Sequence, residues 1–423
     1  MKNLKQMKRL TAVLTVCLML LVIVLQAPAV SACSALELES AEGDTYWFRT
    51  CDMDDTYNVF GENGSYIGAS ELISYPKGST LSFVTGDVVA EHTVMGMSFG
   101  QSLAMLDGMN DAGLTGGLLF LDEGTETADE NVPEDFEIMA AMEGVTWFLA
   151  RCGSVDEVVA LANKTCIQAL EVPGVPGSDL TATLHFNFVD STGRNVVIEA
   201  ADLENPGRFT IYEGTGVMTN SPPYDWQLEH LQEYIGDAPK LQEKGIDSIT
   251  VNGVKLDGKP TGAEQVLPGG NTPPERLIRL TMSRYFCNEG KTISNADMLA
   301  RGSGIMSIVN RAIHDKNIEG AEGSYTQYTV CYDVARQQMY IRPYDTTFWT
   351  TINLSEVNAE ERATYPMYRG DDNATVEALS IGAEEEAAPA VSNTNTALVV
   401  VVCILAAAVF FLLLALNRKR KTA

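Results

Sequence analysis

Cys33 is the residue of this sequence best placed to do covalent chemistry. It follows a small-residue stretch that suits cleavage by signal peptidase, with Val30 at the −3 position and Ala32 at the −1 position. Cleavage there makes Cys33 the first residue, so that one residue carries a thiol and an α-amine with ordinary pKa values of about 8.5 and about 8. Such an amine can take the proton of its own thiol, and one residue then supplies both nucleophile and base.

A second interpretation of the same junction competes with the first. The residues Val30 to Cys33 also resemble the lipobox of bacterial lipoproteins, in which the cysteine thiol is lipidated before cleavage. A lipidated sulfur is no longer a nucleophile. The junction therefore leaves two classes of protein open: an exported enzyme with a cysteine nucleophile, and an anchored binding protein built on an enzyme scaffold that no longer turns over.

Two charged residues are predicted to return to the start of the chain in a β-hairpin. Residues 35–39 alternate as a half-buried strand does, residues 42–44 (Glu-Gly-Asp) form a turn, and residues 45–54 continue as a second strand. This hairpin brings Arg49 and Asp52 back towards Cys33. We expect Arg49 to hold a thiolate by its charge and Asp52 to orient and polarise the amine.

An amide side chain is predicted at the edge of a rigid element. Asn220 lies between a strand-like run, 208–218, and the Ser-Pro-Pro turn at 221–223. An amide N–H there can stabilise the oxyanion of a tetrahedral intermediate, an interaction commonly worth about 3 kcal/mol. The same amide can also bond only to the backbone of the turn, so the residues alone leave both roles open.

The order of motifs along the chain resembles the choloylglycine hydrolase family, which contains conjugated bile salt hydrolases and penicillin V acylases. The matching segments are CSALELESAEGDTYWFRTCD (33–52), LDGMNDAGLTGGLLFL (106–121), GVMTNSPPYDWQLEHLQEYI (216–235), VLPGGNTPPERLIR (266–279) and YTQYTVCYDVARQQMYIRPYD (325–345). Each segment alone is a weak signal. Their shared order covers nearly the whole region between the terminal segments and makes the resemblance specific.

The resemblance implies a role for each candidate site residue. Cys33 is the nucleophile, Arg49 and Asp52 support its thiol and amine, and Asn220 supplies an oxyanion-hole side chain. Arg276 is implied as a structural and electrostatic member of the site. The implied reaction is hydrolysis of a small-molecule amide through a thioester, with no cofactor.

Two positions depart from the family pattern. The family has Asn or Tyr where this chain has Phe120, at a substrate-contacting position whose backbone N–H helps to bind the oxyanion. The Leu-Pro-Gly-Asp motif ends here in Gly270, which removes a carboxylate near Arg276. Bile salts, penicillin V, N-acyl amines and N-acyl homoserine lactones therefore all remain candidate substrates.

Both ends of the chain carry targeting signals. Residues 1–32 have basic residues, an apolar run and a small-residue junction, as a signal peptide does. Residues 397–416 form an uncharged apolar run of 20 residues that Arg418 to Lys421 follow at once, which predicts a transmembrane helix with a cytoplasmic tail, 417–423. A hydrolase domain at 33–380 and a linker at 381–396 would then lie outside the cell, on a single-pass protein of the cell membrane.

The net charge of the region between the terminal segments indicates which kinds of partner it can bind. The two terminal segments hold 8 of the 29 basic residues and none of the 56 acidic ones, so the region between them carries a formal charge of −35. Such a field repels nucleic acid, and we expect no nucleic-acid partner. The resemblance implies a possible homo-oligomer.

Histidine and cysteine spacing predicts no metal site. The chain has only four histidines, and the six cysteines between the terminal segments show no CxxC pair. An exported protein can pair cysteines, and the candidate pairs are Cys152 with Cys166 and Cys287 with Cys331.

Strand and helix patterns together predict an α+β fold. Strands are expected at 181–190 and 194–203 around a hairpin at 191–193, and helices are expected at 136–151, after a capping pattern at Ser154 and Glu157, and at 225–234, 275–286 and 295–313. Strands at both ends with helices between them favour two sheets covered by helices. The resemblance sharpens this expectation to the four-layer αββα sandwich of N-terminal nucleophile hydrolases.

Overall fold

A computed structural model describes residues 33–62, 64–128, 131–179, 183–311 and 324–370. The predicted signal peptide, linker, transmembrane helix and tail lie outside these residues, and so do the last ten residues of the predicted hydrolase domain. Within the described ranges no helix is long and apolar enough to cross a membrane.

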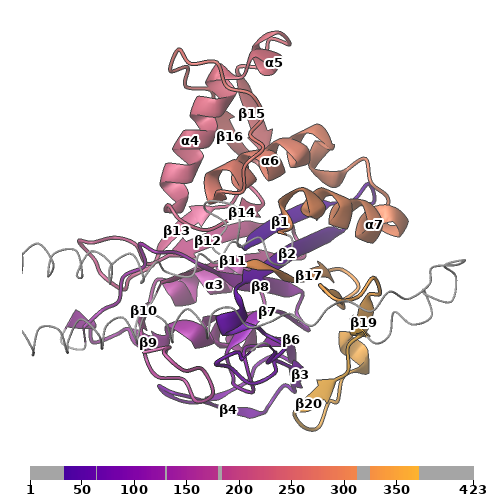
Figure 1. The fold of residues 1–423 in the computed structure, drawn as a ribbon. Coiled ribbons are helices and arrows are strands. Elements are labelled where there is room, and N and C mark those ends of the chain that lie inside the picture. The colour runs from indigo at the N-terminus through magenta and orange to yellow at the C-terminus, as the bar shows by residue number, and fades with distance from the viewer. Residues whose placement is uncertain (1–32, 63, 129–130, 180–182, 312–323, 371–423) are drawn as a thin grey trace, which may run out of the picture. The chain divides into compact units, whose positions relative to one another are not determined.

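The first sheet has six strands and contains the chain's first hairpin (Figure 1). Its strands, in spatial order, are β14 (Val217–Met218), β1 (Ser34–Glu39), β2 (Thr45–Met53), β17 (Tyr325–Asp333), β18 (Gln338–Pro343) and β19 (Thr350–Asn353). All neighbouring strands are antiparallel. The predicted hairpin is confirmed, with its turn in the predicted place between β1 and β2.

The second sheet has eight antiparallel strands. Their spatial order is β13 (Thr210–Glu213), β12 (Asn195–Glu199), β11 (Leu184–Asp190), β8 (Leu114–Phe120), β7 (Met105–Asn110), β6 (Val94–Ser98), β3 (Leu72–Tyr75) and β20 (Ala363–Tyr365). The predicted hairpin at 191–193 joins β11 to β12. Every residue of β11 and β12 is buried, so both faces of these strands are covered.

Helices cover the outer face of each sheet. The six-stranded sheet is covered by α6 (Pro273–Phe286) and α7 (Asn295–Met306), which pack against β1 and β2 (Figure 1). The eight-stranded sheet is covered by α2 (Gly144–Arg151) and α3 (Val155–Ala162), which pack against strands from β6 to β12. The layer order is therefore helix, sheet, sheet, helix, and the predicted αββα architecture is confirmed.

A smaller group of elements extends from α6. It consists of α4 (Tyr224–Asp237), α5 (Pro239–Gln242) and the hairpin of β15 (Ser248–Val251) and β16 (Val254–Asp257). Both α6 and α4 pack on this hairpin. The remaining short elements are β4 (Thr80–Phe83), β5 (Gly86–Val89), β9 (Glu137–Ala140), β10 (Thr165–Gln168), η1 (Asp55–Tyr57), η3 (Ala141–Glu143), η4 (Asn288–Gly290), η5 (Ser307–Val309) and η6 (Leu354–Glu356).

The helix expected at 136–151 is wrong in its first half. Residues 137–140 form β9, which pairs in parallel with β10, and the helix begins only at Gly144. The strand partner comes from residues 165–168, so tertiary pairing overrides a local helical pattern. The other expected helices are confirmed, although α7 ends at Met306 and the residues after 311 in the expected span are not described.

The expected disulfides are also wrong. Cys152, Cys166, Cys287 and Cys331 all carry thiols that form no disulfide. Cys287 ends α6, where its sulfur donates to the Arg284 carbonyl and accepts from the Gly290 N–H, both at 3.2 Å. Cys331 lies in the middle of β17, opposite Phe48. Cys287 and Cys331 thus lie on different elements, one at the end of a helix and one within a strand.

Candidate active site

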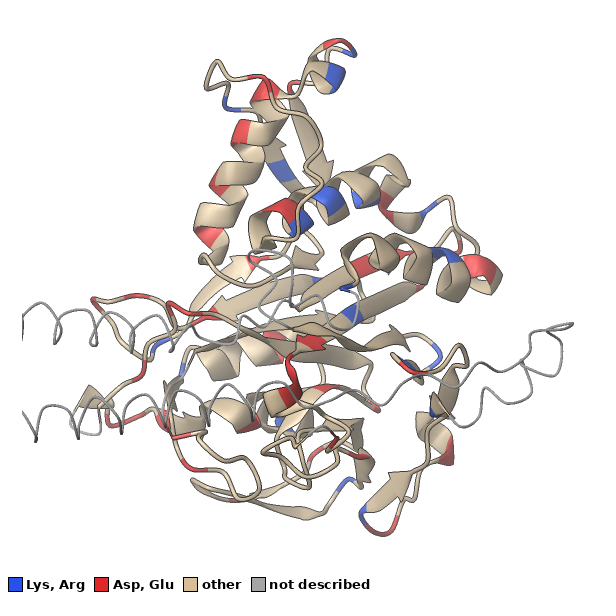
Figure 2. Ribbon diagram, in the orientation of Figure 1, with Lys and Arg blue, Asp and Glu red and all other residues tan. Residues whose placement is uncertain are grey.

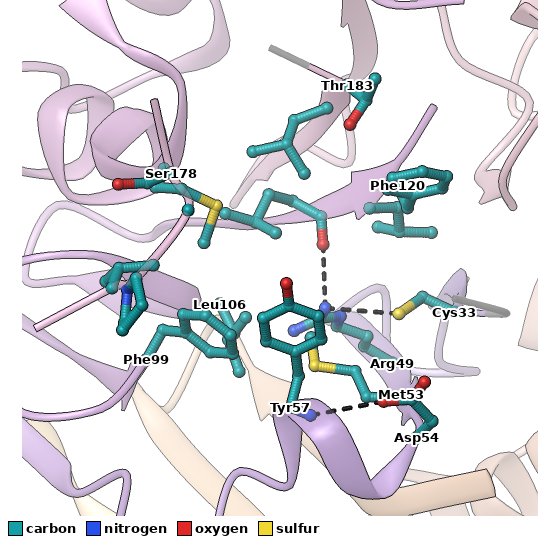
Figure 3. A pocket seen from close by; sticks show the side chains of 17 residues that line it. Cys33, Arg49, Met53, Asp54, Tyr57, Phe99, Leu106, Phe120, Ser178 and Thr183 are labelled. Atoms are coloured by element: carbon teal, nitrogen blue, oxygen red, sulfur yellow. Dashed lines mark hydrogen bonds between the residues drawn. The ribbon is translucent and has the colours of Figure 1, made fainter. Parts of the chain in front are cut away.

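The register of the first hairpin brings Cys33, Arg49 and Asp52 together. Ala35 lies opposite Arg49 and Ser34 lies opposite Thr50, so Cys33 lies beside the part of β2 that follows Thr50. The Cys33 sulfur is 3.7 Å from the Arg49 Nη2 atom (Figure 3) and 3.5 Å from the Asp52 backbone nitrogen, and both of these groups donate. Two donors, one of them charged, favour a thiolate at this position.

Arg49 is held by a buried cluster that sequence reasoning missed. Its Nη1 atom donates to the Asp107 carboxylate and, at 3.1 Å, to the Tyr328 hydroxyl, while Nη2 donates to the Leu118 carbonyl at 2.9 Å. The hydroxyls of Tyr328 and Tyr332 donate to Asp107 at 2.6 and 2.7 Å. The signal in the sequence was an acidic residue between the apolar residues Leu106 and Met109 of a buried strand.

This cluster joins the two sheets. Arg49 and the two tyrosines lie on strands of the six-stranded sheet, and Asp107 lies on β7 of the eight-stranded sheet. A second link, from the Trp47 indole nitrogen to the Asn187 side-chain oxygen at 2.8 Å, crosses the same interface. The charge beside the Cys33 sulfur is therefore fixed by both layers of the sandwich.

Asp52 lies on the other face of β2 from Arg49, because side chains alternate along a strand. Burial and, after it, the charge of Cys33 raise the pKa of Asp52 to about 7, although Arg276, a hydrogen bond from Thr326 and Arg311 oppose the rise. A carboxyl with a pKa near neutrality exchanges its proton readily near pH 7. Such a group is suited to receive or hold the proton of a neighbouring amine.

Arg276 connects the nucleophile to Asn220. Its Nη1 atom donates to the Cys33 carbonyl at 2.6 Å and to the Ser34 hydroxyl, and its Nη2 atom donates to the Asn220 Oδ1 atom at 2.9 Å. Burial lowers the pKa of Arg276 to about 10, so it stays charged near neutral pH. Arg276, Arg279 and Arg284 give α6 the basic bands seen along this helix in Figure 2.

The Asn220 side chain is fixed by Phe120 as well as by Arg276. Its Nδ2 atom donates to the Phe120 carbonyl at 2.9 Å. Nδ2 carries two N–H bonds, so one of them serves Phe120 and the second can serve a substrate oxygen. The structure thus brings five predicted residues together: Cys33, Arg49, Asp52, Asn220 and Arg276.

The Glu275 carboxylate lies where Gly270 lacks the acidic side chain of the family motif. A Cβ atom on Gly270 would stand 2.2 Å from one Glu275 carboxylate oxygen and 2.4 Å from the other. Glu275 closes a capping box with Thr272 at the start of α6. The hydrogen bond from the Thr272 side chain, together with Arg279, lowers the pKa of Glu275. Negative charge therefore remains beside the arginines of α6.

An apolar pocket opens beside the Cys33 sulfur, with a cavity volume of about 180 Å³ (Figure 3). Arg49 lines its inner end, and Phe120 lies on the Cys33 side, opposite Phe99 and Ser178. The other described lining residues are Met53, Asp54, Tyr57, Leu106, Leu118, Leu119, Met142, Val175, Pro176, Gly177, Thr183 and Leu184. The pocket accepts an apolar group and places it next to the nucleophile.

In the described part of the chain, no group of three His, Cys, Asp or Glu side chains is placed to hold a metal ion. The site combines a thiol that faces two donors, a buried carboxyl, an amide and an apolar pocket.

Comparison with known proteins gives one family match. Residues 33–365 match the model of linear amide C-N hydrolases, choloylglycine hydrolase family. The bile salt hydrolase/transferase of Clostridium perfringens is 24% identical over 345 residues, which cover 78% of this chain and 94% of that protein. The penicillin V acylase of Pectobacterium atrosepticum is 28% identical over 190 residues, 44% of this chain and 42% of that protein.

Two solved structures share the fold. A variant of the conjugated bile acid hydrolase from Clostridium perfringens has a TM-score of 0.60 at 21% identity, covering 80% of this chain and 98% of that one. The penicillin V acylase from Agrobacterium tumefaciens has a TM-score of 0.57 at 18% identity, covering 77% and 88%.

Proposed function

Since the chain belongs to the choloylglycine hydrolase family of linear amide C-N hydrolases, we propose that it cleaves its substrate through a thioester on Cys33. The observation that carries this proposal is the pair of donors, Arg49 and the Asp52 backbone N–H, directed at the Cys33 sulfur beside an apolar pocket. Arg276 links the backbone of Cys33 to Asn220, because it donates to the Cys33 carbonyl and to the Asn220 Oδ1 atom.

The proposed reaction begins with removal of residues 1–32. The freed α-amine of Cys33 takes the thiol proton, and the sulfur attacks the amide carbonyl of the substrate. The second N–H of Asn220 and the backbone N–H of Phe120 stabilise the oxyanion. The C–N bond then breaks, the leaving amine departs with the proton, and water hydrolyses the thioester to release the acid.

Arg49 and Asp52 have separate tasks in this proposal. Arg49 stabilises the thiolate from inside the sandwich, and Asp52, on the opposite face of β2, holds the ammonium that forms when the amine takes the proton. Because the Asp52 pKa is about 7, the carboxyl is ionised in an increasing fraction of molecules as the pH rises through neutrality. Its support of the ammonium grows in the same range.

Conjugated bile salts are the substrates we propose first. The apolar lining of the pocket supports an apolar acyl group, and relatives named bile salt hydrolase/transferase match more than nine-tenths of their own length to this chain. One observation favours a second candidate, a single-ring or short acyl group as in penicillin V or an N-acyl amine. A cavity of about 180 Å³ is close to the volume of about 150 Å³ that encloses one benzene ring.

Location is part of the same proposal. We propose that the protein is exported, that its hydrolase domain lies outside the cell, and that residues 397–416 anchor it in the membrane. The apolar run and the basic residues that follow it support this arrangement. The competing protein, an inactive binding protein lipidated at Cys33, would need two membrane anchors.

The Cys33→Ser variant tests the catalytic proposal. We expect hydrolysis of the preferred substrate to fall at least roughly 10³-fold, because a serine hydroxyl is a far weaker nucleophile than a thiolate. The assay measures free amine released from glycine- and taurine-conjugated bile salts, penicillin V and an N-acyl homoserine lactone.

Cys331→Ala is the matched control, since it removes a buried thiol from another strand of the same sheet. It should keep near-native turnover. Unchanged hydrolysis by a folded Cys33→Ser variant would exclude the thioester route.

A further inference from the structure

His185 is buried in the second sheet between two acceptors. It lies on β11 directly opposite Glu199 of β12, and both side chains are fully buried. The His185 Nδ1 atom is 2.7 Å from the Glu199 Oε1 atom, and its Nε2 atom is 2.8 Å from the backbone carbonyl oxygen of Thr219. Thr219 is the residue before Asn220.

The partners of His185 determine where its protons are. A backbone carbonyl can only accept, so Nε2 must carry a proton. The His185 Nδ1 atom pairs with Glu199, whose carboxyl oxygens also accept from the Tyr224 backbone N–H at 3.2 and 2.9 Å. His185 therefore donates to the Thr219 carbonyl from Nε2 while Glu199 fixes the other side of its ring inside the core.

Glu199 adds a second restraint on the same segment. Tyr224 is the first residue of α4, and the preceding Pro223 has no side-chain group that can cap the helix. The Glu199 carboxylate takes that position, where negative charge is favoured by the helix dipole. One carboxylate thus fixes both His185 and the start of the helix that follows the Asn220 turn.

The Asn220 segment is held from several sides, and a buried side chain holds the carbonyl that precedes it. Gln227 of α4 donates to the Asn220 carbonyl at 2.5 Å and to the Pro222 carbonyl at 2.6 Å. His185 holds the Thr219 carbonyl, which belongs to the peptide unit that supplies the Asn220 nitrogen. Rotation of that peptide would turn the Asn220 side chain away from Phe120 and from the pocket.

We propose that His185 and Glu199 are a positioning pair that fixes the Thr219–Asn220 peptide and so aims the Asn220 amide at the substrate oxyanion. The inference rests on the proposed function, since it assigns the oxyanion contact to Asn220. Neither His185 nor Glu199 lines the pocket beside Cys33. We therefore expect their effect on the reaction to pass through Asn220.

Loss of the pair should slow the chemical step without weakening binding. An oxyanion contact is made only in the transition state, so its misplacement lowers kcat and leaves KM unchanged. Removing one oxyanion donor commonly costs about 10²-fold to 10³-fold, and misplacing it costs less. We expect His185→Gln to lower kcat by about 10-fold to 100-fold.

A double-mutant cycle with Asn220→Ala is the test. The measurements are kcat and KM of the exported enzyme, His185→Gln, Asn220→Ala and the double variant, on the best substrate of the panel above. If His185 acts through Asn220, adding His185→Gln to Asn220→Ala changes kcat by less than about twofold. A residue that only stabilises the fold would lower kcat by the same factor in both backgrounds, and that result would overturn the proposal.

Two further variants keep the test decisive. His92→Gln is the control, because His92 lies partly exposed beside Asp111, and it should leave both constants unchanged. Should His185→Gln fail to fold, Glu199→Gln enters the same cycle with the same expected outcome. Cys33→Ser in the same assay separates the two proposals: its activity would sink the thioester route, while an inactive Cys33→Ser with an additive cycle would sink only the positioning pair.

Discussion

Single side chains set the charge next to the nucleophile. Arg49 points at the Cys33 sulfur because its other nitrogen is fixed by Asp107 from the opposite sheet. The sequence predicted Arg49 itself, since the hairpin turn is local. It did not predict Asp107, Tyr328 and Tyr332 as its anchors, because they come from strands more than 50 residues away along the chain.

Asp107→Asn should weaken both the fold and the activity. The two tyrosine hydroxyls and Arg49 all donate to the Asp107 carboxylate. In the asparagine variant the side-chain NH₂ group would face one of these donors, and the buried Arg49 would lose the negative charge that pairs with it. We expect the free energy of unfolding to fall by about 3 kcal/mol and kcat to fall with it. Urea unfolding and steady-state kinetics measure the two effects.

Asp111→Asn is the control for this prediction. Asp111 lies at the end of the same hairpin with a more exposed carboxylate that pairs with His92 at 3.2 Å. A surface pair contributes about 0 to 1 kcal/mol, so the variant should behave like the native protein. Equal losses of stability and kcat in Asp107→Asn and Asp111→Asn would contradict a specific role of the buried Arg49–Asp107 cluster.

Strands and helices position these residues through close contact between the sheets. Gly117 of β8 lies opposite Asp107, and a Cβ atom there would stand 2.8 Å from the Trp47 ring. The hairpins were predictable because their turns and alternation are local. The strand at 137–140 was not, because its partner β10 is distant in the sequence and the local pattern is helical.

Gly117→Ala should force the sheets apart at the site. The added methyl group meets the Trp47 ring and the Asp107 Cβ atom, which is 3.1 Å away. Overpacking a buried site in this way typically lowers the free energy of unfolding by about 1 to 3 kcal/mol. We also expect a lower kcat, because the Asp107 contact to Arg49 shifts. Denaturant unfolding of the variant gives the first quantity and amide hydrolysis the second.

Gly304→Ala in α7 serves as the comparison, because a Cβ atom at Gly304 meets nothing within 4 Å. Alanine favours the helix over glycine by up to about 1 kcal/mol, so this variant should be as stable as the native protein or more stable. A Gly117→Ala variant with native stability would contradict the close packing of the two sheets.

At the scale of the whole molecule, buried carboxyls link stability to pH. Burial raises the pKa of Glu37 to about 6, of Asp52 to about 7 and of Glu143 to about 7. Each group keeps its proton in the folded chain at pH values where the unfolded chain has lost it. The folded state then binds more protons, so the free energy of unfolding falls as the pH rises from about 4.5 to about 7.

Glu143→Gln isolates one of these groups. Glu143 accepts from the Val84 N–H at 3.1 Å, and glutamine can accept the same bond without ionising. We expect the variant to be more stable than the native protein at pH 8 by at least about 1 kcal/mol, with the difference vanishing near pH 4.5. Urea titrations at several pH values measure it, and a difference that does not change with pH would refute the link.

The architecture of the whole molecule was the most predictable part, because the order of several motifs specified it together. The substrate was the least predictable, because the pocket combines side chains from distant segments, such as Tyr57, Phe99, Met142 and Leu184. No local pattern in the sequence places these four side chains around one cavity.

We propose that Cys33 works as an unblocked N-terminal residue. N-terminal peptide mass spectrometry of the active protein, purified from the cells that produce it, measures this directly. We expect a first residue Cys33 with an unmodified thiol and amine. A diacylglyceryl group on Cys33, or an active chain that still continues before residue 33, would contradict it.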